Sequence, residues 1–149
     1  MEYTKVEWLI IAPLAGLASI AFAVYLFFYV NKQDSGSPRM REISAAIREG
    51  ANAYLKRQTK TLAVFVILIA LVLGIALGYQ MAMAYVIGSI FSAVAGFFGL
   101  NVAVRANVRT SNAAGKGLTK AFPIAFYGGA VMGLAVVGLA LLGISALYY

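Results

Sequence analysis

Four long stretches of this sequence contain no charged side chain, and they constrain the fold more than any other feature. They cover residues 8–30, 62–79, 84–104 and 122–149. The hydrocarbon core of a bilayer is about 30 Å thick, and a helix crosses it with about 20 apolar residues. A backbone in lipid must satisfy its own hydrogen bonds, which helices do. The sequence therefore predicts an all-α, polytopic membrane protein with four transmembrane helices.

The composition agrees with a chain that lies mostly in lipid. Hydrophobic residues make up 62% of the 149 positions, and charged residues make up 11%, against about 25% in ordinary soluble domains. The chain has no cysteine and no histidine, and its five carboxylates all lie in the first third. Its own residues therefore supply no disulfide, thiolate ligand or histidine base, and they supply few ligands for a divalent cation.

Basic residues lie almost entirely on one side of the apolar stretches. Eleven of the twelve Lys and Arg residues fall between the first and second stretches or between the third and fourth, and only Lys5 falls on the other side. Basic loops stay in the cytoplasm. We therefore predict that both termini face outward and that the two basic loops are cytoplasmic. This topology explains the net charge of +7 without nucleic-acid binding.

The segments between the stretches differ in kind. Residues 31–38 (NKQDSGSP) are rich in turn formers and predict a loop. Residues 40–61 repeat apolar side chains at spacings of three and four, which predicts an amphipathic helix leading directly into the second span. Residues 80–83 predict a short connection, and residues 105–120 predict a basic loop with a turn at residues 115–117.

Small residues recur at spacings of four inside the apolar stretches. Such residues let helix backbones approach closely in lipid, so we expect them to pack helices together. Some of them also suit contacts with helices beyond this chain. The positions are Gly74, Gly78, Gly88, Ser92, Gly96, Gly99, Gly128, Gly129, Gly133, Gly138 and Gly143.

The spans carry almost no polar chemistry. None contains Asp, Glu, Lys or Arg, although ion and proton pathways usually place such a residue inside the membrane. Asn101 is the strongest polar group near a span interior, and we expect it to form an interhelical hydrogen bond. Taken alone, the four helices therefore predict a scaffold and not a conduction path.

Three patterns outside the spans are weak candidates for binding sites. The Gly-Lys pair at residues 115–116 resembles the end of a phosphate-binding loop, but Thr110 and Gly117 stand where that motif has Gly and Ser or Thr. Glu42 and Glu49 share a helix face and could hold Mg²⁺, although nearby arginines favour a solvated face. The basic residues could attract a phosphate compound or lipid headgroups, but topology already explains them. We assign no catalytic, cofactor-binding or metal-binding residue to this chain.

Four segments of the sequence carry a resemblance to a known family. They are residues 47–58 (IREGANAYLKRQ), 88–99 (GSIFSAVAGFFG), 106–110 (ANVRT) with Ala113-Ala114, and 125–133 (AFYGGAVMG). In order, they resemble the start of the second helix, the third helix, the following cytoplasmic loop and the start of the fourth helix of membrane-bound, ion-pumping pyrophosphatases. The resemblance covers nearly the whole chain from Trp8.

This resemblance implies a homodimer of long subunits with inner and outer rings of helices. It implies hydrolysis of Mg-pyrophosphate in the cytoplasm, coupled to outward transport of H⁺ or Na⁺, with K⁺ dependence as a possibility. The family's substrate pocket uses Asp-rich motifs, Lys and Asn on later helices, and its first four helices belong to the outer ring.

The chain stops before the first Asp-rich motif of that family. We therefore expect a single transmembrane unit over residues 1–149, the N-terminal outer-ring part of a longer pump in a prokaryotic plasma membrane. Its expected partners are the lipid bilayer and the remaining helices, and alone it should not hydrolyse pyrophosphate. The alternatives are a self-contained four-span scaffold or accessory subunit and a small oligomeric channel, which the apolar spans disfavour.

Overall fold

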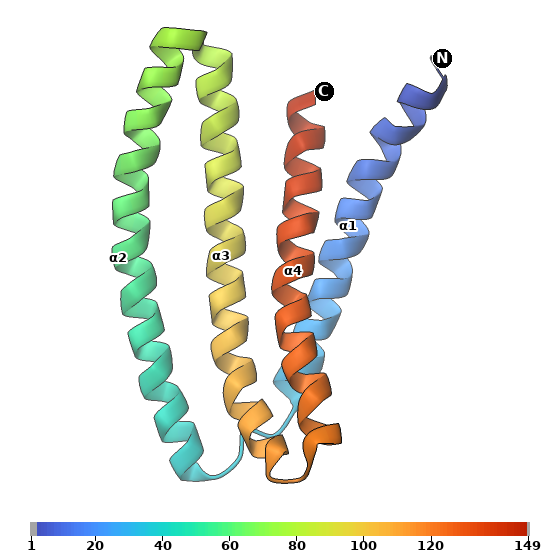
Figure 1. The fold of residues 1–149 in the computed structure, drawn as a ribbon, viewed down its shortest axis with the longest axis vertical. Coiled ribbons are helices and arrows are strands. Elements are labelled where there is room, and N and C mark those ends of the chain that lie inside the picture. The colour runs from blue at the N-terminus through green and yellow to red at the C-terminus, as the bar shows by residue number, and fades with distance from the viewer. Residues whose placement is uncertain (1–2, 149) are drawn as a thin grey trace.

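The protein is a layer of four long helices that run alternately up and down (Figure 1). The computed structural model describes the backbone of residues 3–148 and the side chains of residues 10–148. All four helices are long and apolar enough to cross a membrane, which confirms the predicted fold. They are α1 (Tyr3–Lys32), α2 (Pro38–Leu77), α3 (Tyr79–Ala114) and α4 (Leu118–Tyr148).

The start of α1 and the end of α4 lie at the same end of the bundle as the turn between α2 and α3 (Figure 1). The other two connections, residues 33–37 and residues 115–117, lie together at the opposite end. We call this opposite end the basic end. The arrangement is the one that four antiparallel spans require, and it brings the two polar connections close to each other.

The amphipathic segment and the second span form one continuous helix, as predicted. The Ser37 hydroxyl caps α2 by accepting the Met40 N–H at 3.3 Å, and Pro38 occupies the first position, where its missing N–H costs nothing. The 40 residues of α2 extend about 60 Å at 1.5 Å per residue. This is twice the thickness of a bilayer core, so the basic half of α2 extends beyond the membrane.

The connection between the second and third spans is shorter than predicted. A short connection at residues 80–83 was expected, but these residues belong to α3, and Gly78 alone separates the two helices. Its φ of +94° lies in the left-handed region that favours glycine. Gly78 therefore reverses the chain, and the expectation that it packs two helices together was wrong.

The predicted basic loop at residues 105–120 is mostly helical. α3 continues to Ala114, and only residues 115–117 form the turn, where the Lys116 N–H donates to the Ala113 carbonyl at 2.9 Å. The prediction of a turn at these three residues is confirmed, but the prediction of a loop before it was wrong. The prediction took polar residues as a sign of a loop. In the structure, polar side chains of this last part of α3 donate hydrogen bonds to carbonyls at the end of α1 and in the linker between α1 and α2.

The helices pack in the order α2, α3, α4 and α1 (Figure 1). Among the described residues, α2 packs only against α3, and α1 packs against α4 and touches α3 near the basic end. The core is small and consists mainly of Ala and Val, with Leu26 and Ile124 as its larger members. Small side chains let these helices lie close together in the absence of a hydrophobic driving force in lipid.

The predicted packing glycines of α3 and α4 fall into two groups. A Cβ on Gly128 would lie 2.6 Å from the Ala106 Cβ, and a Cβ on Gly138 would lie 2.6 Å from Ile20 Cγ1, so these two glycines pack helices together as predicted. Gly99 and Gly143 are similarly close to Met132 and Phe91. By contrast, a Cβ would meet no described atom within 4 Å at Gly88, Gly96, Gly129 and Gly133. The second group leaves open faces on α3 and α4.

The predicted orientation can be tested by labelling with a membrane-impermeant maleimide. Since the chain has no cysteine, Ser35→Cys and Gln80→Cys each introduce a single thiol at opposite ends of the bundle. We expect Ser35→Cys to react in inside-out vesicles and Gln80→Cys to react in intact cells, because basic segments stay cytoplasmic. The reverse pattern would contradict the predicted topology.

Candidate functional site

Arg109, near the end of α3, connects α3 to the end of α1 by hydrogen bonds. Its Nε donates to the Gln33 carbonyl at 3.1 Å, and its Nη2 donates to the Asn31 carbonyl at 3.1 Å. Its Nη1 donates to the Arg105 carbonyl at 2.8 Å within α3. The last carbonyls of a helix have no partner inside the helix and carry a partial negative charge. Arg109 therefore caps the end of α1 from a helix distant in sequence.

Asp34 organises the linker between α1 and α2. Its Oδ1 accepts the Gly36 N–H at 2.9 Å, its backbone carbonyl accepts Asn112 Nδ2 at 3.1 Å, and its Oδ2 lies 3.9 Å from Lys116 Nζ. The Gly36 amide, and after it Asn112 and Lys116, lower the pKa of Asp34 below its ordinary value. The carboxylate is therefore ionised at neutral pH, and its bonds weaken only as the pH falls through that lowered pKa.

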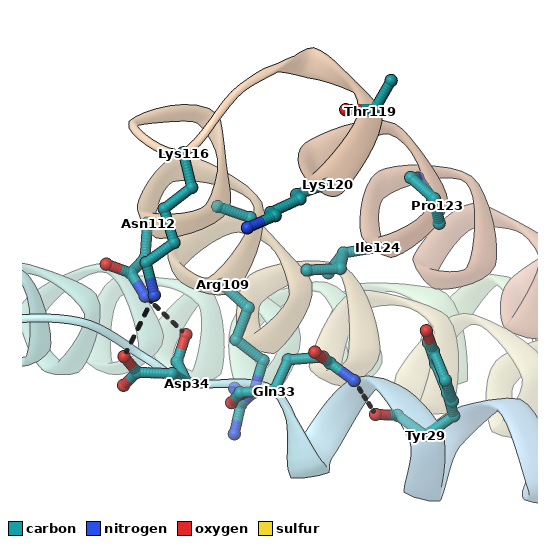
Figure 2. Close-up of a pocket in the computed structure, with 11 residues that line it drawn as sticks. Tyr29, Gln33, Asp34, Arg109, Asn112, Lys116, Thr119, Lys120, Pro123 and Ile124 are labelled. Carbon is teal, nitrogen blue, oxygen red and sulfur yellow. Dashed lines mark hydrogen bonds and ion pairs between the residues drawn. The ribbon is translucent and has the colours of Figure 1, made fainter.

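These contacts border a pocket of about 370 Å³ between α1, α3 and α4. Figure 2 shows Lys116 beside Asp34, and it shows Arg109 and Lys120 on the same side of the pocket. Tyr29, Pro123 and Ile124 form the apolar side. Three cations against one carboxylate make this pocket electropositive, which suits binding of an anion.

The structure places the weaker sequence candidates in structural roles. Asn101 donates to the Phe97 carbonyl at 2.9 Å in its own helix, so the expected interhelical hydrogen bond was wrong. A carbonyl four residues earlier is always within reach on a helix and satisfies a polar side chain in lipid. Glu42 pairs with Arg39 at 2.8 Å on an exposed face. Gly115 has helical dihedral angles, so it ends α3 and does not open a phosphate-binding loop.

The carboxylates of the described residues do not form a metal centre. No group of three acidic, His or Cys residues gathers among the side chains that the structure describes. Asp34 is engaged by Gly36 and Lys116, and Glu42 is engaged by Arg39. A Mg²⁺ ion prefers several oxygen ligands in octahedral geometry. These residues therefore do not fit a Mg-pyrophosphate site.

Sequence reasoning missed the group formed by Arg109, Asn112, Lys116 and Asp34. A signal was present, because Arg109 and Asn112 are three residues apart, which places them on one face of a helix, and Lys116 follows four residues later in the turn. The prediction of a loop at residues 105–120 concealed that face. The partnership with Asp34 joins residues that are 78 positions apart, and local periodicity does not report such contacts.

Comparison with known proteins supplies the family. The family model for the inorganic H⁺ pyrophosphatase matches residues 17–149, which is most of the chain. The chain belongs to this family. This membership confirms the resemblance found in the sequence, and it agrees with the four spanning helices.

Curated relatives of this chain are named as pyrophosphate-energised ion pumps. It is 51% identical over 139 residues to a K⁺-insensitive pyrophosphate-energised proton pump of Methanosarcina mazei, with 92% of this chain and 21% of the relative covered. It is 46% identical over 143 residues to a putative K⁺-stimulated pyrophosphate-energised sodium pump of Clostridium tetani, with 96% and 21% covered. A K⁺-stimulated pyrophosphate-energised sodium pump of Thermotoga maritima is 41% identical over 123 residues, with 81% and 17% covered. The chain thus spans about a fifth of the length of these relatives.

Proposed function

We propose that this chain is the N-terminal helical scaffold of a pyrophosphate-energised ion pump, in which it forms a single transmembrane unit over residues 1–149. The match of the family model over residues 17–149 carries this proposal. The relatives named as proton or sodium pumps are similar to nearly the whole chain. In the full protein, pyrophosphate hydrolysis would drive outward transport of H⁺ or Na⁺.

The chemistry of the basic end supports a scaffold role over a catalytic role. The polar atoms of Arg109 and Asp34 form hydrogen bonds with the end of α1 and with the linker that follows it. The described carboxylates do not gather around a common point. We therefore propose that the pump holds Mg²⁺ and pyrophosphate with residues outside this chain.

A groove between α2 and α3 supports contact with further helices of the pump. Its volume is about 850 Å³, and Gly88, Ser92 and Gly96 of α3 lie along it. A small-residue face lets another helix approach closely in lipid. About four-fifths of the length of the relatives lies outside the matched region, so such helices are available in a full-length pump. We propose that one of them occupies this groove.

Several finer assignments rest on the family and complete the proposal. We propose that the full protein is a homodimer, that it uses Mg²⁺, and that it resides in the plasma membrane of a prokaryote. The relatives are named as both K⁺-insensitive and K⁺-stimulated pumps, so similarity to them does not assign a K⁺ dependence to this chain, and we propose that residues outside it set that dependence. The alternative is a separate four-span accessory subunit without enzymatic activity.

A chimera tests the pump proposal. The matched fifth of the Methanosarcina mazei relative is replaced by this chain, since the two are 51% identical. We expect the chimera to retain Mg-dependent pyrophosphate hydrolysis and proton uptake into inside-out vesicles, while the purified 149-residue chain releases no phosphate. Gly96→Leu should abolish activity in the chimera by filling the groove, because a Cβ there meets no described atom within this chain.

The controls separate assembly from folding. Gly96→Leu in the chain alone should leave its helical circular dichroism unchanged, since the groove is open there. A folded, membrane-inserted chimera without hydrolysis would contradict the pump proposal. Phosphate release by the chain alone would contradict the scaffold role.

A further inference from the structure

We propose that the pocket between α1, α3 and α4 at the basic end binds a phosphate group, and that its source is the headgroup of an anionic phospholipid. This assignment is independent of pump activity. It rests on the charge of the pocket, on the helix end that borders it, and on its position relative to the apolar spans.

The charge of the pocket favours a phosphate group. Lys116 and Lys120 line it, and Lys120 makes no ion pair with the part of the chain that the structure describes. Lys116 lies 3.9 Å from Asp34, which is longer than a close charge-assisted hydrogen bond. Arg109 adds a third positive charge at the pocket wall, although its nitrogens already donate to carbonyls. The pocket thus carries two ammonium groups without a close hydrogen bond to described residues and a guanidinium that is held by carbonyl groups.

The start of α4 adds donors at the same place. α4 begins at Leu118, and the N–H groups of Lys120 and Ala121 already donate to the Gly117 carbonyl at 3.1 and 3.3 Å, so the N–H groups of Leu118 and Thr119 are the open donors among the described residues of this first turn. The first N–H groups of a helix have no acceptor inside it, and the helix dipole makes this end positive. Thr119, in this first turn, borders the pocket (Figure 2). An anion there would meet both lysines and the end of the helix.

The position of the pocket favours a lipid as the source of that phosphate. Tyr29 and Ile124 lie at the ends of the predicted spans at residues 8–30 and 122–149, and both line the pocket. In the same turns of α4 that supply Pro123 and Ile124 to the pocket, Phe122 and Phe126 are exposed and stack on each other with ring centroids 6.0 Å apart. Aromatic side chains concentrate at the membrane interface, and basic pockets between helices there bind anionic headgroups. Acyl chains would lie along this exposed face of α4.

Fluorescence quenching by brominated lipid tests the proposal. Thr119→Cys, the only thiol in the chain, carries a bimane label, and the protein is placed in phosphatidylcholine nanodiscs. We expect dibrominated phosphatidylglycerol, as a minor component, to quench the label more strongly than dibrominated phosphatidylcholine. Lys116→Gln with Lys120→Gln should weaken this preference by about fivefold for each lysine removed.

Matched variants separate the pocket from general charge and from misfolding. Lys56→Gln with Lys60→Gln removes the same charge from exposed positions on α2 and should keep the preference. Lys116→Arg with Lys120→Arg keeps the charge in place and should restore most of the preference. Equal quenching by the two lipids, or an undiminished preference in the Lys116/Lys120 glutamine variant, would overturn the lipid assignment.

Soluble anions distinguish the two sources of a phosphate group. Inorganic phosphate and pyrophosphate are titrated into phosphatidylcholine nanodiscs, with binding followed by calorimetry. If they bind in a manner that depends on Lys116 and Lys120 while phosphatidylglycerol is not preferred, the phosphate site stands and its source is soluble. If neither the lipid nor these anions depend on the lysines, the phosphate site itself is refuted.

Discussion

The Gly138→Val variant is expected to unfold far more readily than the parent chain. A Cβ at this position would lie 2.6 Å from Ile20 Cγ1, 2.9 Å from the Gly16 carbonyl oxygen and 3.3 Å from the Ile20 nitrogen. Two of these atoms belong to the backbone of α1, so no side-chain rotation relieves the contact. Overpacking of this kind typically costs about 1–3 kcal/mol, and rigid backbone neighbours place Gly138→Val at the upper end of that range.

The measurement is SDS-induced unfolding in mixed micelles, followed by circular dichroism. Gly133→Val is the matched control, because it places the same residue on α4 at a position where a Cβ meets no described atom within 4 Å. Both variants carry the same change in helix propensity, so their difference isolates the contact with α1. Equal destabilisation of the two variants would show that α1 and α4 do not pack as described.

Removing the Arg109 side chain is expected to release the end of α1 from α3. Arg109→Ala deletes two hydrogen bonds to the carbonyls of Asn31 and Gln33. Hydrogen bonds from charged groups contribute about 1.5–3 kcal/mol each when their loss leaves a partner unsatisfied. Water can replace part of these hydrogen bonds at the basic end. We therefore expect the free-energy cost of local opening to fall by about 2 kcal/mol, which raises the population of the open state roughly thirtyfold.

Limited trypsin digestion reports this opening, because the Lys32–Gln33 bond lies at the end of α1. Mass spectrometry of that single cleavage should show it to be much faster in Arg109→Ala. Arg109→Lys should fall between the variant and the parent, since one ammonium group cannot reproduce the planar fork that reaches two carbonyls. Arg57→Ala, at an exposed position on α2, should cleave at the parental rate. Equal rates in Arg57→Ala and Arg109→Ala would remove Arg109 from this role.

Much of the fold follows from patterns that are local in the sequence. The cost of placing charge in hydrocarbon is large, so an uncharged run of sufficient length predicts a span without knowledge of its neighbours. The spacing of apolar side chains by three and four joins residues 40–61 to the second span in one helix, which the structure confirms as α2. The glycine-rich stretch at residues 115–117 predicts the turn that the structure shows there.

The errors arise where a local pattern has two meanings. Glycine both packs helices and reverses the chain, and Gly78 reverses it with a φ of +94°. Polar residues occur both in loops and on helix faces, and residues 105–114 form the end of α3 because Arg109 and Asn112 find acceptors in the linker. Whether a glycine packs or reverses the chain, and whether polar residues form a loop or a helix face, depends on where a second segment lies. The hydropathy of one segment gives no information on that position.

The sequence alone determined the membrane class, the four spans, the asymmetry of charge and the family. Each of these depends on residue type and spacing along one segment, where burial in lipid is the dominant free energy. Only the tertiary structure decided which glycines pack helices together, as Gly138 does, and which leave an open face, as Gly133 does. It also decided that Asp34 and Lys116 meet beside Lys120 around one pocket. Contacts between segments far apart in the chain are set by the packing of α1 on α4 and of α4 on α3. The sequence alone does not predict them, because side chains that meet in this way have no common period along the chain.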